Sequence, residues 1–180
     1  MRVIAGDRKG LRLVSPRGQD TRPTEDRIKE NIFNLMGQNF YGTKVLDLFS
    51  GTGSIGIEFL SRGAEKAYFV DNSRSAIEAI SENIEKAHYE ENSIVLKMNS
   101  KSAIGKLIGE KFDFIYMDPP FGDEKLYENT VKLIIENNML EDDGYLIIEQ
   151  DKDLKVDFSK YLSNVKFKNY GNTSVGIWEK

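Results

Sequence analysis

The stretch VLDLFSGTGSIG at residues 45–56 decides how this chain folds. It begins as an apolar run, breaks at Gly51 and Gly53, and continues in a helical pattern. An apolar strand that leads through a glycine turn into a helix is the unit from which parallel α/β sheets are built. Glycines at such a turn let the backbone approach a nucleoside closely, and the helix that follows directs its first amide N–H groups toward the ligand. This stretch therefore predicts a strand, a glycine turn and a helix that together hold a cofactor.

Short apolar runs and amphipathic segments alternate from residue 44 onward. The pattern predicts strands over 44–49, 67–70, 93–97, 112–117 and 145–149, and helices over 54–62, 73–87, 103–107 and 125–137. Such alternation is typical of a doubly wound parallel sheet with helices on both faces. Residues 165–170 and 173–178 read as two strands joined by Gly171 and Asn172, which requires an antiparallel hairpin. We predict a three-layer α/β fold, mostly parallel, that ends in this hairpin.

The first 42 residues predict two smaller elements. Residues 2–5 and 10–15 read as a short β-ribbon with a basic tip, and Thr24 reads as the N-cap of a helix that Gly37 ends. Residues 1–22 carry a net charge of +4, which leaves −8 for the rest of the chain. This distribution is expected if the arm meets phosphates, or it is a solvated arm with an excess of arginine. We divide the single domain into an arm (1–22), a packed helix (23–42) and a catalytic part (43–180).

Composition narrows the class of protein. A chain of 180 residues can bury a sizeable core without disulfides, and this one has no cysteine. It contains no apolar run near the ~20 residues of a membrane span and no apolar core of a signal peptide. We expect a cytoplasmic protein with no membrane partner and no metal, and we favour a monomer. The lone His88 is expected at the surface, without a catalytic role.

The glycine turn is compatible with two kinds of cofactor. Gly51-x-Gly53-x-x-Gly56, with Asp71 twenty residues after the first glycine, fits nicotinamide and adenosyl cofactors equally well. Asp47 separates them, because a carboxylate inside an apolar strand would repel a pyrophosphate and attract a cationic sulfonium or ammonium group. The alternative is that Asp47 is only a structural acid. We favour the sulfonium cofactor.

A second polar site follows the strand at 112–117. The sequence Asp118-Pro119-Pro120-Phe121 lies at the carboxyl end of that strand, beside the cofactor crevice of an α/β sheet. A carboxylate and a rigid proline carbonyl make a pair of acceptors for an amino group, and a phenylalanine beside them can stack on a base. The alternative is a plain turn with Phe121 in the core.

Both sites resemble motifs of known enzymes. Residues 47–53 resemble the first motif of Rossmann-like S-adenosylmethionine-dependent methyltransferases, and residues 118–121 are similar to the Asp/Asn-Pro-Pro-aromatic motif of those that methylate amino groups of nucleobases or glutamine. The resemblance implies that Asp118, Pro119 and Phe121 are catalytic. It implies cofactor contacts by Asp47, Phe49, Gly51, Gly53, Asp71, Asn72, Asn99 and Ser100. Asn99 stands where these enzymes usually have an acid near the adenine, and Phe49 also suits the core.

The remaining segments resemble one family within this class. Residues 2–6 (RVIAG), 10–13 (GLRL), 22–30 (RPTEDRIKE) and 170–173 (YGNT) look like the bacterial 16S rRNA guanine-N2 methyltransferases of the RsmD type. The resemblance implies methylation of one guanine in small-subunit rRNA, free or in an assembling subunit. It implies RNA contacts by Arg2, Arg8, Lys9, Arg12, Arg22, Thr24 and Arg27. Open alternatives are a DNA adenine or protein glutamine methyltransferase, a NAD-dependent oxidoreductase, and a non-catalytic RNA-binding module.

Overall fold

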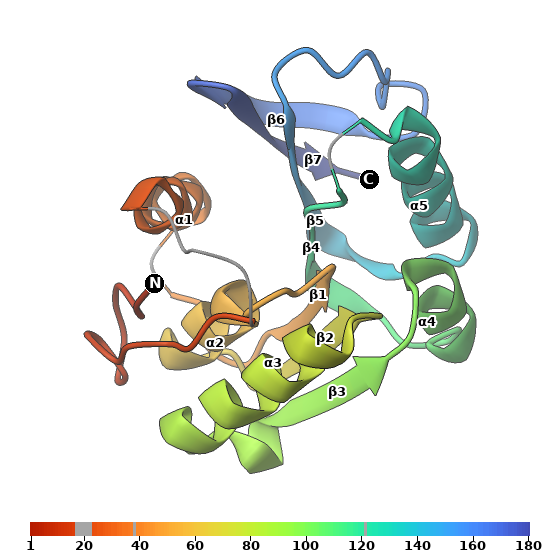
Figure 1. Ribbon diagram of the computed structural model, residues 1–180. Coiled ribbons are helices and arrows are strands. Elements are labelled where there is room, and N and C mark those ends of the chain that lie inside the picture. Colours follow the sequence, from red (N-terminus) through yellow and green to blue (C-terminus); the bar gives the residue numbers. More distant parts are fainter. Residues whose placement is uncertain (17–22, 38, 121) are drawn as a thin grey trace.

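A computed structural model describes residues 1–16, 23–37, 39–120 and 122–180 (Figure 1). Within them, one sheet of seven strands has the order β3-β2-β1-β4-β5-β7-β6. The first five strands of this order are parallel neighbours, whereas β7 runs antiparallel to both β5 and β6. The strands are β1 (Lys44–Leu48), β2 (Lys66–Asp71), β3 (Ser93–Lys97), β4 (Phe112–Met117), β5 (Leu140–Asp151), β6 (Ser163–Tyr170) and β7 (Thr173–Glu179). The predicted parallel sheet with an antiparallel terminal hairpin is confirmed.

Helices cover both faces of the sheet, which gives the three predicted layers (Figure 1). The helices are α1 (Pro23–Met36), α2 (Ser54–Ser61), α3 (Arg74–Ala87), α4 (Ser100–Lys106) and α5 (Glu124–Glu136), with a 3₁₀ turn, η1, at Glu90–Asn92. The buried core likewise consists of two clusters, one on each face of the sheet. One cluster contains Ile32, Ile57 and Ile80 of α1, α2 and α3, and we call its side of the sheet the first face. The other contains Ile104 and Ile134 of α4 and α5 and lies on the second face.

The predicted starts of α3 and α5 each differ from the structure by one residue, and those of α1 and α4 require a larger correction. Helix α1 begins at Pro23, so the prediction that Thr24 is its N-cap is wrong; proline suits the first helical position, where no N–H is needed. Helix α4 begins at Ser100, three residues earlier than predicted, because the side chain of Asn99 caps it. Gly37, with φ of 116°, follows the last residue of α1 as predicted. Arg22 lies outside the described residues.

The amino-terminal ribbon is shorter than predicted and is docked on the body. Its two segments share a single antiparallel bridge, Arg2 to Arg12, so they do not form regular strands. The turn between them lies against the end of α2. The backbone N–H of Asp7 donates to the carbonyl of Ser61 at 2.9 Å. Gly6 has φ of +84°, and a Cβ there would lie 1.7 Å from that same carbonyl oxygen, so the close approach requires glycine.

Glu58 of α2 joins the arm, α1 and α2 in one buried network. Its fully buried carboxylate accepts the backbone N–H groups of Ile4 and Ala5 at 2.8 and 2.9 Å. It also pairs with Lys29 of α1 at 3.3 Å and with Arg62 at 2.9 Å. Burial lowers the pKa of Lys29, and the neighbouring Glu58 opposes that shift. The arm is therefore a fixed part of the fold up to its turn.

Candidate active site

Four polar side chains share the first face at the carboxyl ends of three central strands. In β1, Val45 packs in the first-face cluster and Leu46 in the other, so Asp47 projects to the first face. The same alternation places Tyr116 of β4, Asp118 just after it, and Glu149 of β5 on that face. The register pairs Asp47 with Tyr116 and Tyr116 with Ile147. These side chains therefore lie along one rim, by which we mean the carboxyl ends of β1, β4 and β5 on the first face of the sheet.

The glycine turn after β1 leaves an open surface beside this rim. Gly51 and Gly53 have φ of 56° and 74°, in the left-handed region that favours glycine. A Cβ on Gly51 would meet no atom of the described chain within 4 Å, whereas one on Gly53 would touch the ring of Phe69 at 3.3 Å. Phe49 also has a positive φ of 62° where the chain leaves the strand. The backbone at Gly51 can thus approach a ligand without obstruction.

The acid predicted to bind a ribose stands at the end of β2. Asp71 accepts the backbone N–H of Gly51 at 2.9 Å with one oxygen and that of Ser73 at 2.8 Å with the other. These bonds fix the carboxylate, which is half exposed, and each oxygen keeps a lone pair for a hydroxyl group. Asn72 beside it is exposed. The position fits the predicted role.

The two residues predicted near an adenine lie at the next strand end. Asn99 follows β3 and is exposed, but its side-chain oxygen accepts the N–H of Ser102 at 2.8 Å as the cap of α4. Ser100 is buried in the first turn of that helix. An amide oxygen accepts two hydrogen bonds, so Asn99 retains one site for a ligand. Sequence reasoning missed this capping role.

Asp47 fits a cationic cofactor. Its side chain is 1% exposed; Oδ2 accepts the N–H of Gly56 at 3.1 Å, and Oδ1 has no hydrogen-bond partner among the described residues. Burial raises the pKa of Asp47 to about 8, with Asp71 adding to the rise and the Gly56 N–H opposing it. The carboxyl is therefore mostly protonated at neutral pH in the cofactor-free protein. A nearby cation would favour its ionised form, which is the chemistry that a sulfonium with an amino-acid tail supplies.

The raised pKa of Asp47 predicts a pH-dependent stability. The folded protein keeps a proton on this carboxyl up to about pH 8, whereas the unfolded chain releases it near 3.8. Folding therefore binds a proton in this window, and the free energy of unfolding falls as pH rises, by at most about 1.4 kcal/mol per unit. Urea unfolding of the cofactor-free protein at pH 6, 7 and 8 should show a steeper fall for wild type than for Asp47→Asn. Equal slopes would mean that Asp47 is ionised throughout.

The second site lies across the rim, in the loop after β4. Asp118 is half exposed, Pro119 is buried and Pro120 is exposed, while Phe121 lies outside the described residues. The carbonyl of Pro119 accepts the hydroxyl of Tyr127 at 3.1 Å, and that hydroxyl also lies 3.2 Å from the carbonyl of Glu149. A carbonyl oxygen has two lone pairs, so one remains for an incoming amine.

Three residues of this site were absent from the sequence-based prediction. Tyr116 donates its hydroxyl to the carboxylate of Glu149 at 2.5 Å, and Tyr127 comes from α5. Burial raises the pKa of Tyr116, with Glu149 and Asp118 as the next causes. The strand alternation could have indicated Glu149, since it directly follows the apolar residues Leu146 to Ile148 near the end of β5. No local signal identifies Tyr127, because it reaches the site from a helix.

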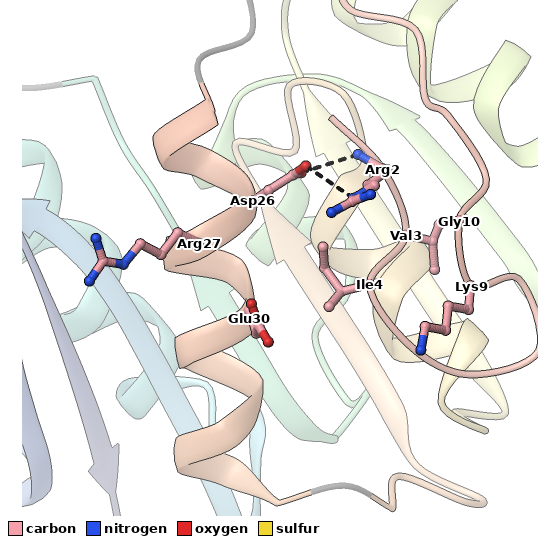
Figure 2. A pocket seen from close by; sticks show the side chains of 8 residues that line it. All are labelled: Arg2, Val3, Ile4, Lys9, Gly10, Asp26, Arg27 and Glu30. Carbon is pink, nitrogen blue, oxygen red and sulfur yellow. Dashed lines mark hydrogen bonds and ion pairs between the residues drawn. The ribbon is translucent and has the colours of Figure 1, made fainter.

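A groove with both cationic and acidic side chains lies between the arm and α1 (Figure 2). It has a volume of about 520 Å³ and is lined by Arg2, Val3, Ile4, Lys9, Gly10, Asp26, Arg27 and Glu30. The backbone N–H of Arg2 donates to Asp26 at 3.1 Å, and its guanidinium lies 3.7 Å from that carboxylate. In Figure 2 the guanidinium of Arg27 extends to the side of α1 away from the arm. Arg2 and Lys9 thus line the groove from the arm, whereas Arg27 lines it from α1 with its guanidinium directed away from the arm (Figure 2).

The other predicted RNA-binding residues have different surroundings. Arg12 is exposed and is the bridge partner of Arg2. Arg8 is held against the body, because its Nε donates to the carbonyl of Ala87 at 2.6 Å and its guanidinium lies over the ring of Tyr89. Thr24 lies within α1, and its side chain is outside the described part of the structure. Arg8 thus has a structural role that sequence reasoning missed.

The fold and this rim define the class of protein. The solved structure of the Escherichia coli protein yhhF, described as a proposed methyltransferase, has a TM-score of 0.87 and 27% identity and covers 100% of this chain and 97% of its own. SMU.776 of Streptococcus mutans, solved with SAH, shares the fold with a TM-score of 0.72 at 16% identity, over 89% of this chain and 50% of that one. The class is the Rossmann-like, S-adenosylmethionine-dependent methyltransferases.

The chain belongs to the family described as conserved hypothetical protein 95, whose model matches residues 1–179. YlbH of Bacillus subtilis, which is named as a proposed rRNA methyltransferase, is 37% identical over 100% of this chain and 99% of its own length. The ribosomal RNA small subunit methyltransferase D of Haemophilus influenzae is 29% identical over 99% of this chain and 93% of its own. The resemblance of the sequence to the RsmD-type methyltransferase family is thereby confirmed. No helix in the described part of the chain is long and apolar enough to cross a membrane.

Proposed function

We propose that this protein transfers a methyl group from S-adenosylmethionine to the exocyclic N2 amine of a guanine in 16S ribosomal RNA. The observation that carries the proposal is the acceptor pair formed by Asp118 and the Pro119 carbonyl, at the same rim as Asp47 and the open Gly51 turn. An enzyme that moved hydride would need no paired acceptors for an amine. The names of the relatives support rRNA as the substrate class.

The acceptor pair addresses the weak nucleophilicity of a base amine. The lone pair of N2 is delocalised into the ring, and two acceptors that hold its hydrogens favour the pyramidal form in which this lone pair can attack. When bound, S-adenosylmethionine supplies an electrophilic methyl group on a sulfonium. N2 forms a bond to the methyl carbon as the sulfur–carbon bond breaks, and the proton that N2 then loses leaves through the hydrogen bond to Asp118. Such positioning can contribute ~7–11 kcal/mol to lowering the barrier.

A methyl-transfer assay tests the proposal. Purified protein and labelled S-adenosylmethionine are incubated with small ribosomal subunits from cells that lack this protein, with naked 16S rRNA, and with DNA. We expect label in the RNA of at least one of the first two substrates and its recovery as N2-methylguanosine after digestion. Label in DNA alone, or in an adenine, would support the alternative amine methyltransferases instead.

We further propose that the arm binds RNA phosphates where small subunits assemble in the cytoplasm. Lys9 and Arg12 are exposed and have no ion-pair partner in the described part of the chain. Each phosphate contact steepens the slope of log K against log salt concentration by about 0.7–0.9. The double variant Lys9→Ala/Arg12→Ala should therefore lower that slope by about 1.4–1.8. Filter binding to 16S rRNA between 50 and 300 mM salt measures it.

The control for this prediction removes the same charge elsewhere. Lys101 and Lys106 are exposed on α4, which covers the second face of the sheet. Lys101→Ala/Lys106→Ala should leave the slope within experimental error of wild type. Equal loss of slope in both double variants would show a general charge effect and would remove the arm from the RNA interface.

A further inference from the structure

A second carboxylate lies directly beside the acceptor pair for the amine. The parallel register pairs Tyr116 with Ile147 and Met117 with Ile148, so the next positions along the two strands are Asp118 and Glu149. Both project to the first face, since the strand alternation is the same. Neighbouring strands lie about 4.8 Å apart. A substrate amine at Asp118 therefore has the Glu149 carboxylate as its neighbour across the strands.

Two tyrosines fix Glu149 in this position. The hydroxyl of Tyr116 donates to Oε2 of Glu149, and Tyr116 is itself 4% exposed between β1 and β5. The hydroxyl of the fully buried Tyr127 lies within hydrogen-bond distance of the backbone carbonyls of both Glu149 and Pro119. The carboxylate and the amine-binding carbonyl are thus tied to one another through side chains that cannot move freely. Glu149 is only partly buried, so a ligand at the rim can reach its side chain.

We propose that Glu149 accepts the N1–H of the target guanine and is the residue that selects guanine over other bases. Guanine carries a donor, N1–H, next to its exocyclic amine. Adenine and cytosine carry an acceptor nitrogen next to theirs, which would face the carboxylate with no hydrogen between them. An ionised carboxylate can only accept, so among the bases that have an exocyclic amine it pairs with the ring nitrogen of guanine alone. This inference rests on the proposed function and adds the residue that determines the base.

The hydrogen bond from N1–H, which guanine can make and adenine and cytosine cannot, is strong enough to decide which base is methylated. A site built to hydrogen-bond one group of a substrate rejects an analogue without that group by factors of about 10⁴ or more. The half-exposed position of Glu149 lets water relieve part of this penalty. A preference of about 100-fold is therefore the smallest that the arrangement should give. Tyr116 acts as a positioning residue, because it touches Glu149 and not the base.

The test compares two bases in one RNA. Once the labelled guanine is mapped, an RNA fragment around it is made with either guanine or 2-aminopurine at that position; 2-aminopurine keeps the N2 amine and lacks N1–H. We expect wild type to prefer guanine at least 100-fold in kcat/KM. In Glu149→Gln the amide N–H can donate to N1 of 2-aminopurine, so the preference should fall below tenfold. Loss of O6 in the analogue affects both proteins equally and cancels in this comparison.

Controls separate selectivity from folding. Glu141, at the other end of β5, pairs with Lys111 at 3.7 Å, and Glu141→Gln should keep the wild-type preference. Binding of S-adenosylmethionine should change less than twofold in Glu149→Gln. Tyr116→Phe should lower the preference while leaving the carboxylate in place, and it serves as the second variant if Glu149→Gln fails to fold. An undiminished preference for guanine in a folded Glu149→Gln overturns the inference. Absence of transfer to guanine by wild type would instead overturn the proposed function.

Discussion

Replacing Asp118 with alanine is expected to lower kcat roughly 10²–10³-fold, the range seen when one preorganised group is removed from an active site. The carboxylate is one of only two acceptors that we assign to the substrate amine, and it lies at the end of β4, across the rim from the glycine turn. Cofactor affinity should therefore change less than twofold. Single-turnover methyl transfer and equilibrium binding of S-adenosylmethionine measure the two quantities separately.

Asp118→Asn is the matched variant for this prediction. It keeps an acceptor oxygen and the shape of the side chain but loses the charge, so it should retain more activity than Asp118→Ala. A collapse of cofactor binding in either variant would place Asp118 in the cofactor site instead. Full activity in Asp118→Ala would show that Asp118 does not hold the substrate amine and would remove it from the catalytic site.

Glu58→Ala is expected to destabilise the protein by about 3–5 kcal/mol, the usual consequence of removing one partner from a buried ion pair. The substitution leaves the ammonium of Lys29 and the guanidinium of Arg62 buried without their carboxylate. It also removes the acceptor for the N–H groups of Ile4 and Ala5. For a chain of this size the loss corresponds to a fall in Tm of roughly 10 °C. Thermal and urea unfolding measure it.

An exposed ion pair provides the control for Glu58. Glu78 pairs with Arg74 at 2.9 Å on the surface of α3, where both side chains are more than half exposed. Glu78→Ala should cost less than about 1 kcal/mol, because water screens such pairs. If the two variants lose similar stability, the buried network is not what attaches the arm and α1 to the body.

Local patterns were sufficient for the strands and helices of the sheet. The ranges predicted for β3 and β4 are those observed, because short apolar runs bounded by polar turns have few alternative conformations. The amino-terminal half of β5 was missed. Residues Glu141 to Gly144 carry charge and a glycine, and they lie in a register shift between the pairs Phe112 with Leu140 and Phe114 with Tyr145, so no alternating pattern marks them as strand. The N-cap of α1 was misplaced because Pro23 and Thr24 both suit a helix start.

The sequence by itself determined the class of fold, the glycine turn and the two acidic strand ends at Asp47 and Asp118. Each of these features is encoded by a short run of neighbouring residues. Helix and strand propensity and hydrophobic periodicity act directly on such a run. Only the tertiary structure decided that Glu149 stands beside Asp118, that Tyr116 and Tyr127 contact Glu149, and that Glu58 anchors the arm. These contacts join residues about 22 to 54 positions apart. Periodicity shows which face a side chain occupies, whereas strand order and register, set by packing of the whole core, choose its neighbour.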